Sequence, residues 1–335
     1  MVSELGAIQA QDWPAAQWAV ALRTTGGTKQ TLDQAIETAR VVRTWPMRGT
    51  LHLVAAKDVR WMLQLLTPRP IAAMRGRLRQ LELTDADLER GREAICTALA
   101  GRRALTRADL YGVLASAGVD PVGQRGIHIL GWLAHHAVVC HGPPNGKQPT
   151  FVLLDEWVAP QPDIDCDEAL RRLATRYFTG HGPATVHDLA WWSGLAAGDV
   201  RRAISAAGDG MLRLRVGDIE YLATSEPAGY PRKTRVQLLP AFDEYLLGYR
   251  DRSAMLAPAD ARHVVQGGMF LPLIVDAGRV VGRWRRALGK ADVGVELEWF
   301  RSASDRVRAA AASAARRYAR YLGLPLRLSW SSAQQ

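Results

Sequence analysis

Two glutamines separated by a single alanine, Gln9 and Gln11 in the segment GAIQAQDWPA, are the first residues whose types and spacing suggest chemistry. Pro14 follows closely, and its fixed φ suits the first turn of a helix. Residues 7–11 therefore read as extended chain, in which side chains two positions apart point the same way. We expect the two amides to share one face, while Ala10 points into the protein.

A pair of neutral amides can position water but cannot remove a proton as a general base at pH 7. Water held against an electrophile reacts faster mainly because it is oriented. Orientation suffices only where the leaving group departs without protonation, as a cationic N7-alkylated purine does. Carbonyl oxygens facing the sugar would also favour its oxocarbenium-like transition state. The alternative for so short a motif is that both amides hydrogen-bond the backbone or face solvent.

A recurring order of elements surrounds this motif: helices separated by polar turns, then two short strands. It is clearest in residues 165–223, where three helical segments precede the alternating strands MLRLRV and IEYLA. Thr185 and Asp188 are spaced like a capping box at the start of the second of these helices. Three helices followed by a hairpin form the layout of a winged helix. The same order recurs at 85–157 and, less completely, at 1–55.

The C-terminal part of the chain has a different pattern. It predicts a hairpin over MFLPLIVDAGRVVGRWRRAL, a strand over VGVELEWF and a long helix that closes the chain at roughly 303–322. We therefore predict an α+β protein with three tandem winged-helix motifs and a C-terminal β-hairpin-containing segment. The predicted parts are an N-terminally short first winged helix with the glutamine pair at 1–80, a second winged helix at 81–160, a third at 161–228, and a β-rich segment with the closing helix at 229–335. We expect short linkers at 158–164 and 224–232.

Charge favours a nucleic-acid partner. The 335-residue chain has a formal net charge of +10, and lysine supplies only five of its 43 basic residues. Arginine matches phosphates and stacks on bases. Codon usage in a GC-rich genome would raise arginine and alanine together, and both are abundant here, so composition alone leaves the partner open.

Other classes of site lack the residues they need. No run of 18 apolar residues is present and the N-terminus does not read as a secretory signal, so we expect a cytoplasmic protein without a membrane partner. Cys96, Cys140 and Cys166 lie far apart, and His135 and His136 are neighbours on a helix without a carboxylate at ligand spacing. We expect no metal and no cofactor.

The chain resembles the AlkZ-like winged-helix DNA glycosylase family almost end to end, in GAIQAQDWPAA, TWPMRGTLHLVAAKDVRWML, LTRADL, RYFTGHGPATVHDLAWWSGL, LLPAFDEYLLGYRDRS and VVGRWRR. The resemblance implies tandem winged helices that form a C-shaped, basic surface for duplex DNA. It implies a monofunctional DNA glycosylase that hydrolyses the N-glycosidic bond of N7-alkylguanine lesions, either bulky monoadducts or interstrand crosslinks, and leaves an abasic site. Both repair of alkylation damage and antibiotic self-resistance fit this activity.

The family's catalytic QΦQ motif maps onto Gln9 and Gln11, with Ala10 as a small Φ residue. Some relatives carry aspartate at the second position, so glutamine there implies a restriction to cationic, labile adducts. Family members usually carry another helix ahead of the motif, whereas eight residues precede Gln9 in this sequence.

Candidate DNA-binding residues lie on two segments. Arg48 in MRGTLHL could contact a phosphate, and His52 could face the site or hydrogen-bond locally. The resemblance favours a role for the hairpin VDAGRVVGRWRR, because the family's DNA-probing hairpin lies in the C-terminal region; Arg279 would then enter the minor groove. Further phosphate-binding candidates on this hairpin are Arg283, Arg285 and Arg286, with plain solvated surface as the alternative.

Two other functions remain open from the sequence. A non-catalytic winged-helix DNA-binding protein or transcriptional regulator would use the same elements only to dock, and dimeric binding to an operator would argue for it. RNA binding is weaker, because no RNP-like aromatic motif is evident. We expect a monomer, associated with the nucleoid, whose partner is double-stranded DNA carrying alkylated purines.

Overall fold

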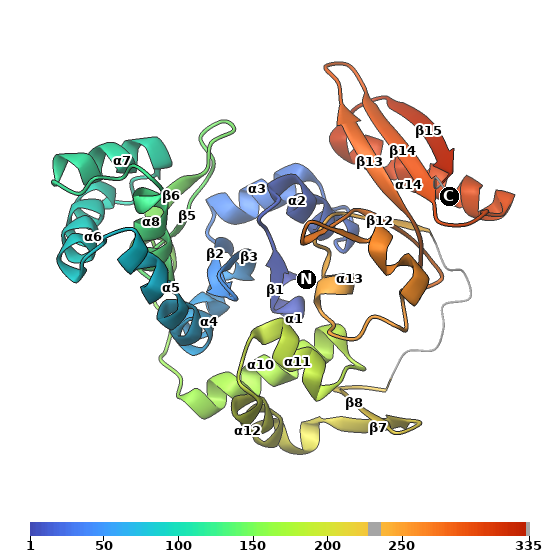
Figure 1. Ribbon diagram of the computed structural model, residues 1–335, viewed down its shortest axis with the longest axis horizontal. Helices are drawn as coiled ribbons and strands as arrows, with labels where there is room; N and C mark the ends of the chain where they lie inside the picture. Colours follow the sequence, from blue (N-terminus) through green and yellow to red (C-terminus); the bar gives the residue numbers. More distant parts are fainter. Residues whose placement is uncertain (227–235, 333–335) are drawn as a thin grey trace. The chain divides into compact units, whose positions relative to one another are not determined.

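The computed structural model describes residues 1–226 and 236–332 and divides into two compact units that interleave along the sequence (Figure 1). The first unit contains Met1–Gln11 and Leu32–Ser225. The second contains Asp12–Thr31 and the chain from Glu226 onward. Most of the predicted linker 224–232, with the predicted boundary after residue 228, lies outside the described residues.

A six-stranded sheet in the order β1-β3-β2-β5-β6-β4 organises much of the first unit, and every neighbouring pair is antiparallel. Its strands are β1 (Ala7–Gln9), β2 (Val41–Met47), β3 (Thr50–Ala55), β4 (Leu105–Thr106), β5 (Val139–His141) and β6 (Thr150–Leu153). Arg43 of β2 pairs with His141 of β5. The strands predicted for the first two winged helices thus belong to a single sheet.

Most of the first unit is helical. Its α-helices are α1 (Val2–Leu5), α3 (Lys29–Glu37, which begins in the second unit), α4 (Ala56–Leu66), α5 (Pro68–Gln80), α6 (Asp85–Leu99), α7 (Arg107–Ser116), α8 (Arg125–His135), α9 (Leu154–Trp157), α10 (Cys166–His181), α11 (Val186–Ser193) and α12 (Ala197–Ala207), and η1 (Gly208–Gly210) is a 3-10 turn. In Figure 1, α10, α11 and α12 gather beside the hairpin of β7 (Leu212–Val216) and β8 (Ile219–Ala223). This order of three helices and a hairpin is the predicted one, while the number of winged helices stays a prediction.

Capping boxes begin three of these helices, with the pairs Thr84 and Asp87, Thr106 and Asp109, and Thr185 and Asp188. In each box the threonine hydroxyl accepts from the aspartate backbone N–H, and the aspartate carboxylate accepts from the threonine backbone N–H. The start predicted at Thr185 is therefore confirmed.

Two glycines fix the path of the N-terminal segment. Gly6, with a φ of 82°, turns the chain from α1 into β1, a conformation that favours glycine. Helix α1 packs against α10 at Gly180, where a Cβ atom would lie 2.8 Å from the carbonyl oxygen of Glu4. The strand that carries Gln9 is thus held from its N-terminal side by helix packing.

A five-stranded sheet in the order β15-β14-β13-β12-β9 organises the second unit. Its strands are β9 (Gln237–Leu239), β12 (Leu273–Asp276), β13 (Arg279–Leu288), β14 (Val293–Trp299) and β15 (Leu326–Ser332). The other elements are α2 (Trp13–Leu22), α13 (Glu244–Leu247), α14 (Asp305–Leu322), the 3-10 helix η2 (Pro258–His263) and the ribbon of β10 (Val265–Gln266) and β11 (Met269–Phe270). The hairpin predicted around Asp276-Ala277-Gly278 is confirmed as β12 and β13.

Helix α2 belongs to the second unit, which differs from its predicted place in a first winged helix at 1–80. The reason is the indole of Trp18, which is 3% exposed and donates its Nε1–H to the carbonyl oxygen of Leu238 at 2.8 Å. The same ring meets Tyr318 edge-on, with 5.0 Å between the ring centroids. Burial of this large aromatic residue ties α2 to the C-terminal sheet.

The prediction that a helix closes the chain is wrong, because α14 is followed by strand β15. This strand pairs in parallel with β14 from Leu326 opposite Val293 onward. The alternation of Leu326, Leu328 and Trp330 is the pattern that predicts such a strand. Within residues 1–226 and 236–332, no helix has the length and apolar character that crossing a membrane requires.

Candidate active site

Gln9 and Gln11 lie together at the end of β1. Gln9 Nε2 donates a hydrogen bond to Gln11 Oε1 at 3.0 Å, and the backbone N–H of Gln11 donates to Gln9 Oε1 at 3.3 Å. Gln9 is only 5% exposed, whereas Gln11 is exposed. Ala10 between them is fully buried, as predicted from the extended segment. The pair therefore presents one amide to solvent and keeps the other beneath it.

Arg43 and Leu51 hold the backbone between the two glutamines. The N–H of Ala10 donates to the carbonyl oxygen of Leu51 at 2.7 Å. The Ala10 carbonyl oxygen accepts from Nε and Nη2 of Arg43 at 3.0 and 2.8 Å. Burial lowers the pKa of Arg43 to about 10, so the guanidinium remains charged at neutral pH. Both polar groups of the Ala10 backbone are thus bound, which fixes the spacing of the pair.

Arg43 was not among the predicted site residues, although the sequence carries a signal for it. It is the one charged residue in the strand segment VVRTWPM. A charged residue in an otherwise apolar strand is retained where a partner requires it.

His52 lies directly opposite Gln9 in the pairing of β1 with β3. Its side chain is fully buried, and Nδ1 lies 2.9 Å from the carbonyl oxygen of Thr50. Facing residues on paired strands are close neighbours. The structure thus brings His52 beside Gln9, and its burial favours packing over direct contact with DNA. That His52 contacts DNA stays a prediction.

Arg48 occupies the turn between β2 and β3, where its φ is 53°. Its Nη1 donates to the carbonyl oxygens of Trp192 and Trp191 at 2.6 and 3.2 Å. These carbonyls lie in the last turn of α11, where a cation is favourable. Arg48 therefore ties the β2–β3 hairpin to α11, and a contact with phosphate stays a prediction.

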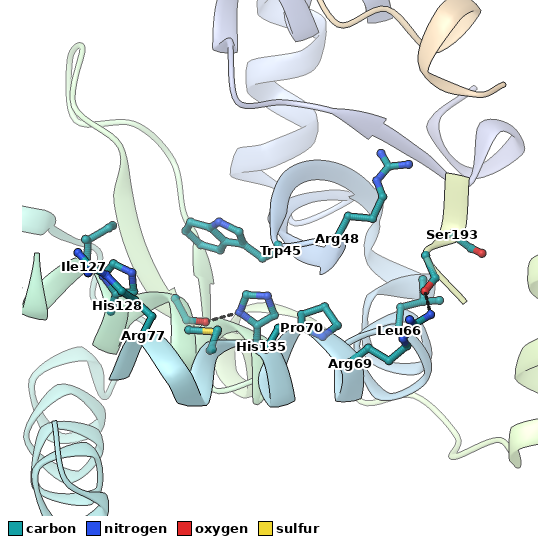
Figure 2. Close-up of a pocket in the computed structure, with 15 residues that line it drawn as sticks. Trp45, Arg48, Leu66, Arg69, Pro70, Arg77, Ile127, His128, His135 and Ser193 are labelled. Carbon is teal, nitrogen blue, oxygen red and sulfur yellow. Dashed lines mark hydrogen bonds between the residues drawn. The ribbon is translucent and has the colours of Figure 1, made fainter. Parts of the chain in front are cut away.

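Arg48 also lines a cavity of about 620 Å³ within the first unit (Figure 2). Arg69 and Arg77 of α5 lie along one side of the cavity, and Trp45 and Arg48 lie on the opposite side (Figure 2). His135 borders the cavity with its Nδ1 2.6 Å from the carbonyl oxygen of Gly131, and burial lowers its pKa. From the sequence, His135 is a candidate only for a metal ligand. Across the described ranges, no three His, Cys, Asp or Glu residues are grouped as metal ligands would be.

The four C-terminal arginine candidates belong to the second unit and differ in their environments. Arg279 is exposed and donates to the carbonyl oxygen of Ala254 at 2.9 Å. The Arg285 side chain is 60% exposed, with Nη2 3.7 Å from Glu298. Two of the four thus present accessible guanidinium groups.

The other two candidates are engaged inside the unit. Arg283 is 20% exposed and donates from Nε to Glu298 Oε2 at 2.7 Å. Arg286 donates from Nη1 to the hydroxyl of Tyr318 at 2.8 Å. That either arginine contacts phosphate stays a prediction. Each already donates to a side chain of the protein, so phosphate would have to compete with that partner.

Three comparisons bear on identity. The sequence family described as "DNA glycosylase AlkZ-like" matches residues 2–321. An "Interstrand DNA cross-link repair glycosylase" from Streptomyces sahachiroi is 29% identical over 305 residues, which cover 85% of this chain and 81% of that protein. The solved structure of Streptomyces sahachiroi DNA glycosylase AlkZ matches with a TM-score of 0.79 at 26% identity, over 98% of this chain and 92% of that one.

These matches confirm the resemblance predicted from the sequence, and they agree with the mixed α+β architecture. They also show that the protein is a DNA glycosylase, an enzyme that acts on DNA. Since the family match spans nearly the whole sequence, the chain belongs to the AlkZ-like DNA glycosylase family.

Proposed function

We propose that this DNA glycosylase hydrolyses the N-glycosidic bond of N7-alkylguanine in duplex DNA and leaves an abasic site. The observation that carries the proposal is the hydrogen-bonded amide pair of Gln9 and Gln11, held through Ala10 by Arg43. The pair supplies orientation without a general base, which matches a cationic leaving group that needs no protonation.

The hydrogen-bonding capacity of Gln11 suits it to hold the attacking water. A carbonyl oxygen can accept two hydrogen bonds, and Gln9 Nε2 uses one position on Gln11 Oε1. The second position can accept a hydrogen from water, whose oxygen lone pair is then aimed at the anomeric carbon. Gln9, nearly buried, fixes the orientation of the Gln11 amide. The next carboxylate in the chain, Asp12, accepts from the N–H of Ala15 at 3.0 Å as a helix cap.

The wider substrate proposal follows the relative from Streptomyces sahachiroi, whose name is interstrand DNA cross-link repair glycosylase. We propose bulky monoadducts and interstrand crosslinks as substrates, bound by a monomer along three tandem winged helices. The net charge of +10 supports contacts with the phosphates that do not depend on base sequence.

The test is single-turnover base release from a duplex with one N7-methylguanine. Gln9→Ala and Gln11→Ala should each reduce release on the order of 100-fold, because misplacement of a reacting group costs about that much. Gln34→Ala is the matched control, since Gln34 is an exposed glutamine on α3. It should release base at the wild-type rate.

Affinity for the undamaged duplex separates catalysis from docking. All three variants should bind it as wild type does. Tight duplex binding without release above the spontaneous rate, from methylated and from crosslinked duplexes, would favour a non-catalytic DNA-binding protein over the proposal.

A further inference from the structure

Two cavities of the first unit adjoin each other. The cavity of about 620 Å³ in Figure 2 lies between α5, α8 and the β2–β3 turn, and we call it the α5 cavity. A second cavity, of about 540 Å³, lies between the sheet and α7, and we call it the α7 cavity. Trp45 and Ile127 line both cavities. The two are therefore compartments of one groove, and each has a volume in the range of small-molecule sites.

The groove is separate from the glutamine pair. Arg43 and its cross-strand neighbour His141 line the α7 cavity. Gln9 lies opposite His52, which in turn pairs with Thr44 of β2. Thr44 and Arg43 are consecutive residues of one strand, so their side chains point to opposite faces of the sheet. An occupant of the α7 cavity is thus on the other face from the side chain of Gln9.

Positive charge lines the groove without an acidic residue to balance it. Among the described residues that line either cavity, none is an aspartate or a glutamate. Arg69 donates to the carbonyl oxygen of Gly194 at 2.7 Å. Arg77 donates to the side-chain oxygens of Gln80 and Gln124 at 3.1 and 3.0 Å. These partners are neutral, so both guanidinium groups still favour a nearby anion. The arginines that line the groove are Arg43, Arg48, Arg69, Arg77 and Arg107.

Aromatic side chains accompany this charge. Trp45 is half-buried and lies across the α5 cavity from α5 (Figure 2). Its ring is nearly parallel to that of Phe151, with an interplanar angle of 9° and 6.5 Å between centroids, which supports the orientation of the indole. Tyr111 is half-buried in the wall of the α7 cavity, and the Arg107 guanidinium lies 6.0 Å from its ring centroid. Each cavity thus combines arginine with an aromatic ring.

This combination is the one that binds single-stranded nucleic acid. Arginines follow the phosphates of such a strand, and the faces of its bases stack on aromatic side chains. In a duplex the bases are paired and stacked on one another, so their faces cannot reach an indole inside a cavity. An unpaired nucleotide offers both its phosphate and the face of its base. DNA is the expected strand, because the protein belongs to a family of DNA glycosylases.

We propose that the groove formed by the α5 and α7 cavities binds a short run of unpaired nucleotides of single-stranded DNA. Arg69 and Arg77 contact its phosphates, and Trp45 stacks on one of its bases. This binding requires neither a lesion nor cleavage, so it goes beyond the proposed function. The protein then holds unpaired DNA on one face of the sheet, while the side chain of Gln9 lies on the other.

A carboxylate placed in the groove tests the assignment. Fluorescence anisotropy measures the Kd of a labelled, undamaged thymidine oligomer of about eight nucleotides, a usual site size for single strands. Ala73 is exposed on α5 and lines the α5 cavity, so Ala73→Glu should weaken binding on the order of 10-fold through repulsion of the phosphates. Ala72→Glu is the matched control, because Ala72 is exposed on the same helix outside the cavity lining. It lowers the net charge equally and should bind as wild type does.

The arginines of α5 provide a second matched set. Arg69→Ala and Arg77→Ala should each make the slope of log K against log salt concentration shallower by about 0.7, the value for one phosphate of a single strand. Arg75→Ala and Arg79→Ala remove exposed arginines of the same helix that do not line the α5 cavity. Both should keep the wild-type slope.

An oligomer of abasic residues with the same number of phosphates separates stacking from charge. Wild type should bind it on the order of 10-fold more weakly than the thymidine oligomer, as expected for one stacked base. Trp45→Leu should bind the two oligomers equally. Equal binding of both oligomers by wild type would overturn the stacking site, whether or not the Trp45 variant folds.

Three further outcomes would overturn the proposal. Equal effects of Ala73→Glu and Ala72→Glu would mean that the strand binds elsewhere. An equal loss by Ala73→Glu on an undamaged duplex of the same length would assign the groove to duplex DNA. Tighter binding of a uridine ribo-oligomer than of the thymidine oligomer would assign it to RNA. All these measurements use undamaged strands, so their failure is distinguishable from a failure of base release, which the N7-methylguanine duplex reports.

Discussion

Arg43 is the residue on which the geometry of the glutamine pair depends most directly. Its two hydrogen bonds to the Ala10 carbonyl oxygen come from a charged group, so they are stronger than neutral ones. We predict that Arg43→Met lowers base release from the N7-methylguanine duplex about 10- to 100-fold, because the amides lose their alignment. Arg43→Lys should recover part of this loss, since an ammonium cannot reproduce the two-pronged contact.

A second arginine provides the control for this prediction. Arg40 is exposed and donates to the hydroxyl of Thr38 at 3.3 Å. Arg40→Met should release base as wild type does. Wild-type release by Arg43→Met would mean that the backbone of Ala10 needs no such anchor.

The buried His141 predicts a dependence of stability on pH. Its pKa is about 3 in the folded protein, whereas an unfolded histidine has a pKa of about 6.5. Between these values the unfolded chain binds a proton that the folded protein does not. The free energy of unfolding should therefore fall as pH drops from about 6.5 toward 3, by at most about 1.4 kcal/mol per pH unit from this one group.

Urea unfolding at pH 7, 6, 5 and 4 measures this contribution. His141→Asn should lower the stability at pH 7 and flatten its decline toward pH 4. His136→Asn changes an exposed histidine on the same chain segment and should leave the decline as in wild type. Parallel curves for wild type and His141→Asn would show that burial does not depress this pKa.

At the scale of elements, the contact of α1 with α10 sets the position of β1. We predict that Gly180→Ala destabilises the protein by about 1–3 kcal/mol, the usual cost of overpacking, because the new Cβ meets backbone at Glu4. Gly198→Ala on α12 is the matched control, since a Cβ there meets nothing within 4 Å. It should stabilise by up to about 1 kcal/mol through helix propensity. Denaturant unfolding checks both, and equal effects of the two would contradict the packing role of Gly180.

Local signals in the sequence predicted many elements and the placement of Gln9 and Gln11 together at the end of β1. The cap at Thr185 and the turn at Asp276-Ala277-Gly278 depend on neighbouring residues, so their patterns are visible in one short window. The common face of Gln9 and Gln11, with Ala10 buried beneath, likewise follows from the period of an extended chain.

Contacts between residues far apart in the chain leave no pattern in a short stretch of sequence, so they could not be predicted. The pairing of Arg43 with His141 joins two predicted domains into one sheet, and no periodicity encodes it. The hydrogen bonds from Arg43 to the Ala10 carbonyl oxygen likewise join residues 33 positions apart. The partner of Trp18 is separated from it by 220 positions, so the sequence could show an apolar helix but not its destination.

At the scale of the whole molecule, the excess of positive charge predicts a salt-dependent affinity for undamaged duplex. A variant that neutralises one phosphate fewer than wild type should have a slope of log K against log salt concentration that is shallower by about 0.9. We predict this change for Arg279→Ala and Arg285→Ala, whose guanidinium groups are exposed. Arg283→Ala should leave the slope unchanged because its guanidinium pairs with Glu298.

Fluorescence anisotropy at several salt concentrations measures these slopes, with the same short duplex for every variant. An equal change in slope for Arg283→Ala would mean that the ion pair with Glu298 opens on DNA. An unchanged slope for Arg279→Ala and Arg285→Ala would remove the C-terminal hairpin from the DNA-binding surface.

The interleaving of the two units has a consequence for how this gene can change. The chain enters the second unit at Asp12, returns to the first at Leu32 and enters the second again at Glu226. A stop codon or fusion point after the β7–β8 hairpin would remove Leu238 and Tyr318. Helix α2 would then lose the two residues that its Trp18 contacts. Recombination at a single breakpoint therefore cannot exchange the C-terminal unit cleanly. The boundary between the units falls at the peptide bond between Gln11 and Asp12, directly after the glutamine pair proposed to position water. If the pair has that role, selection for base release also keeps both units together in one gene.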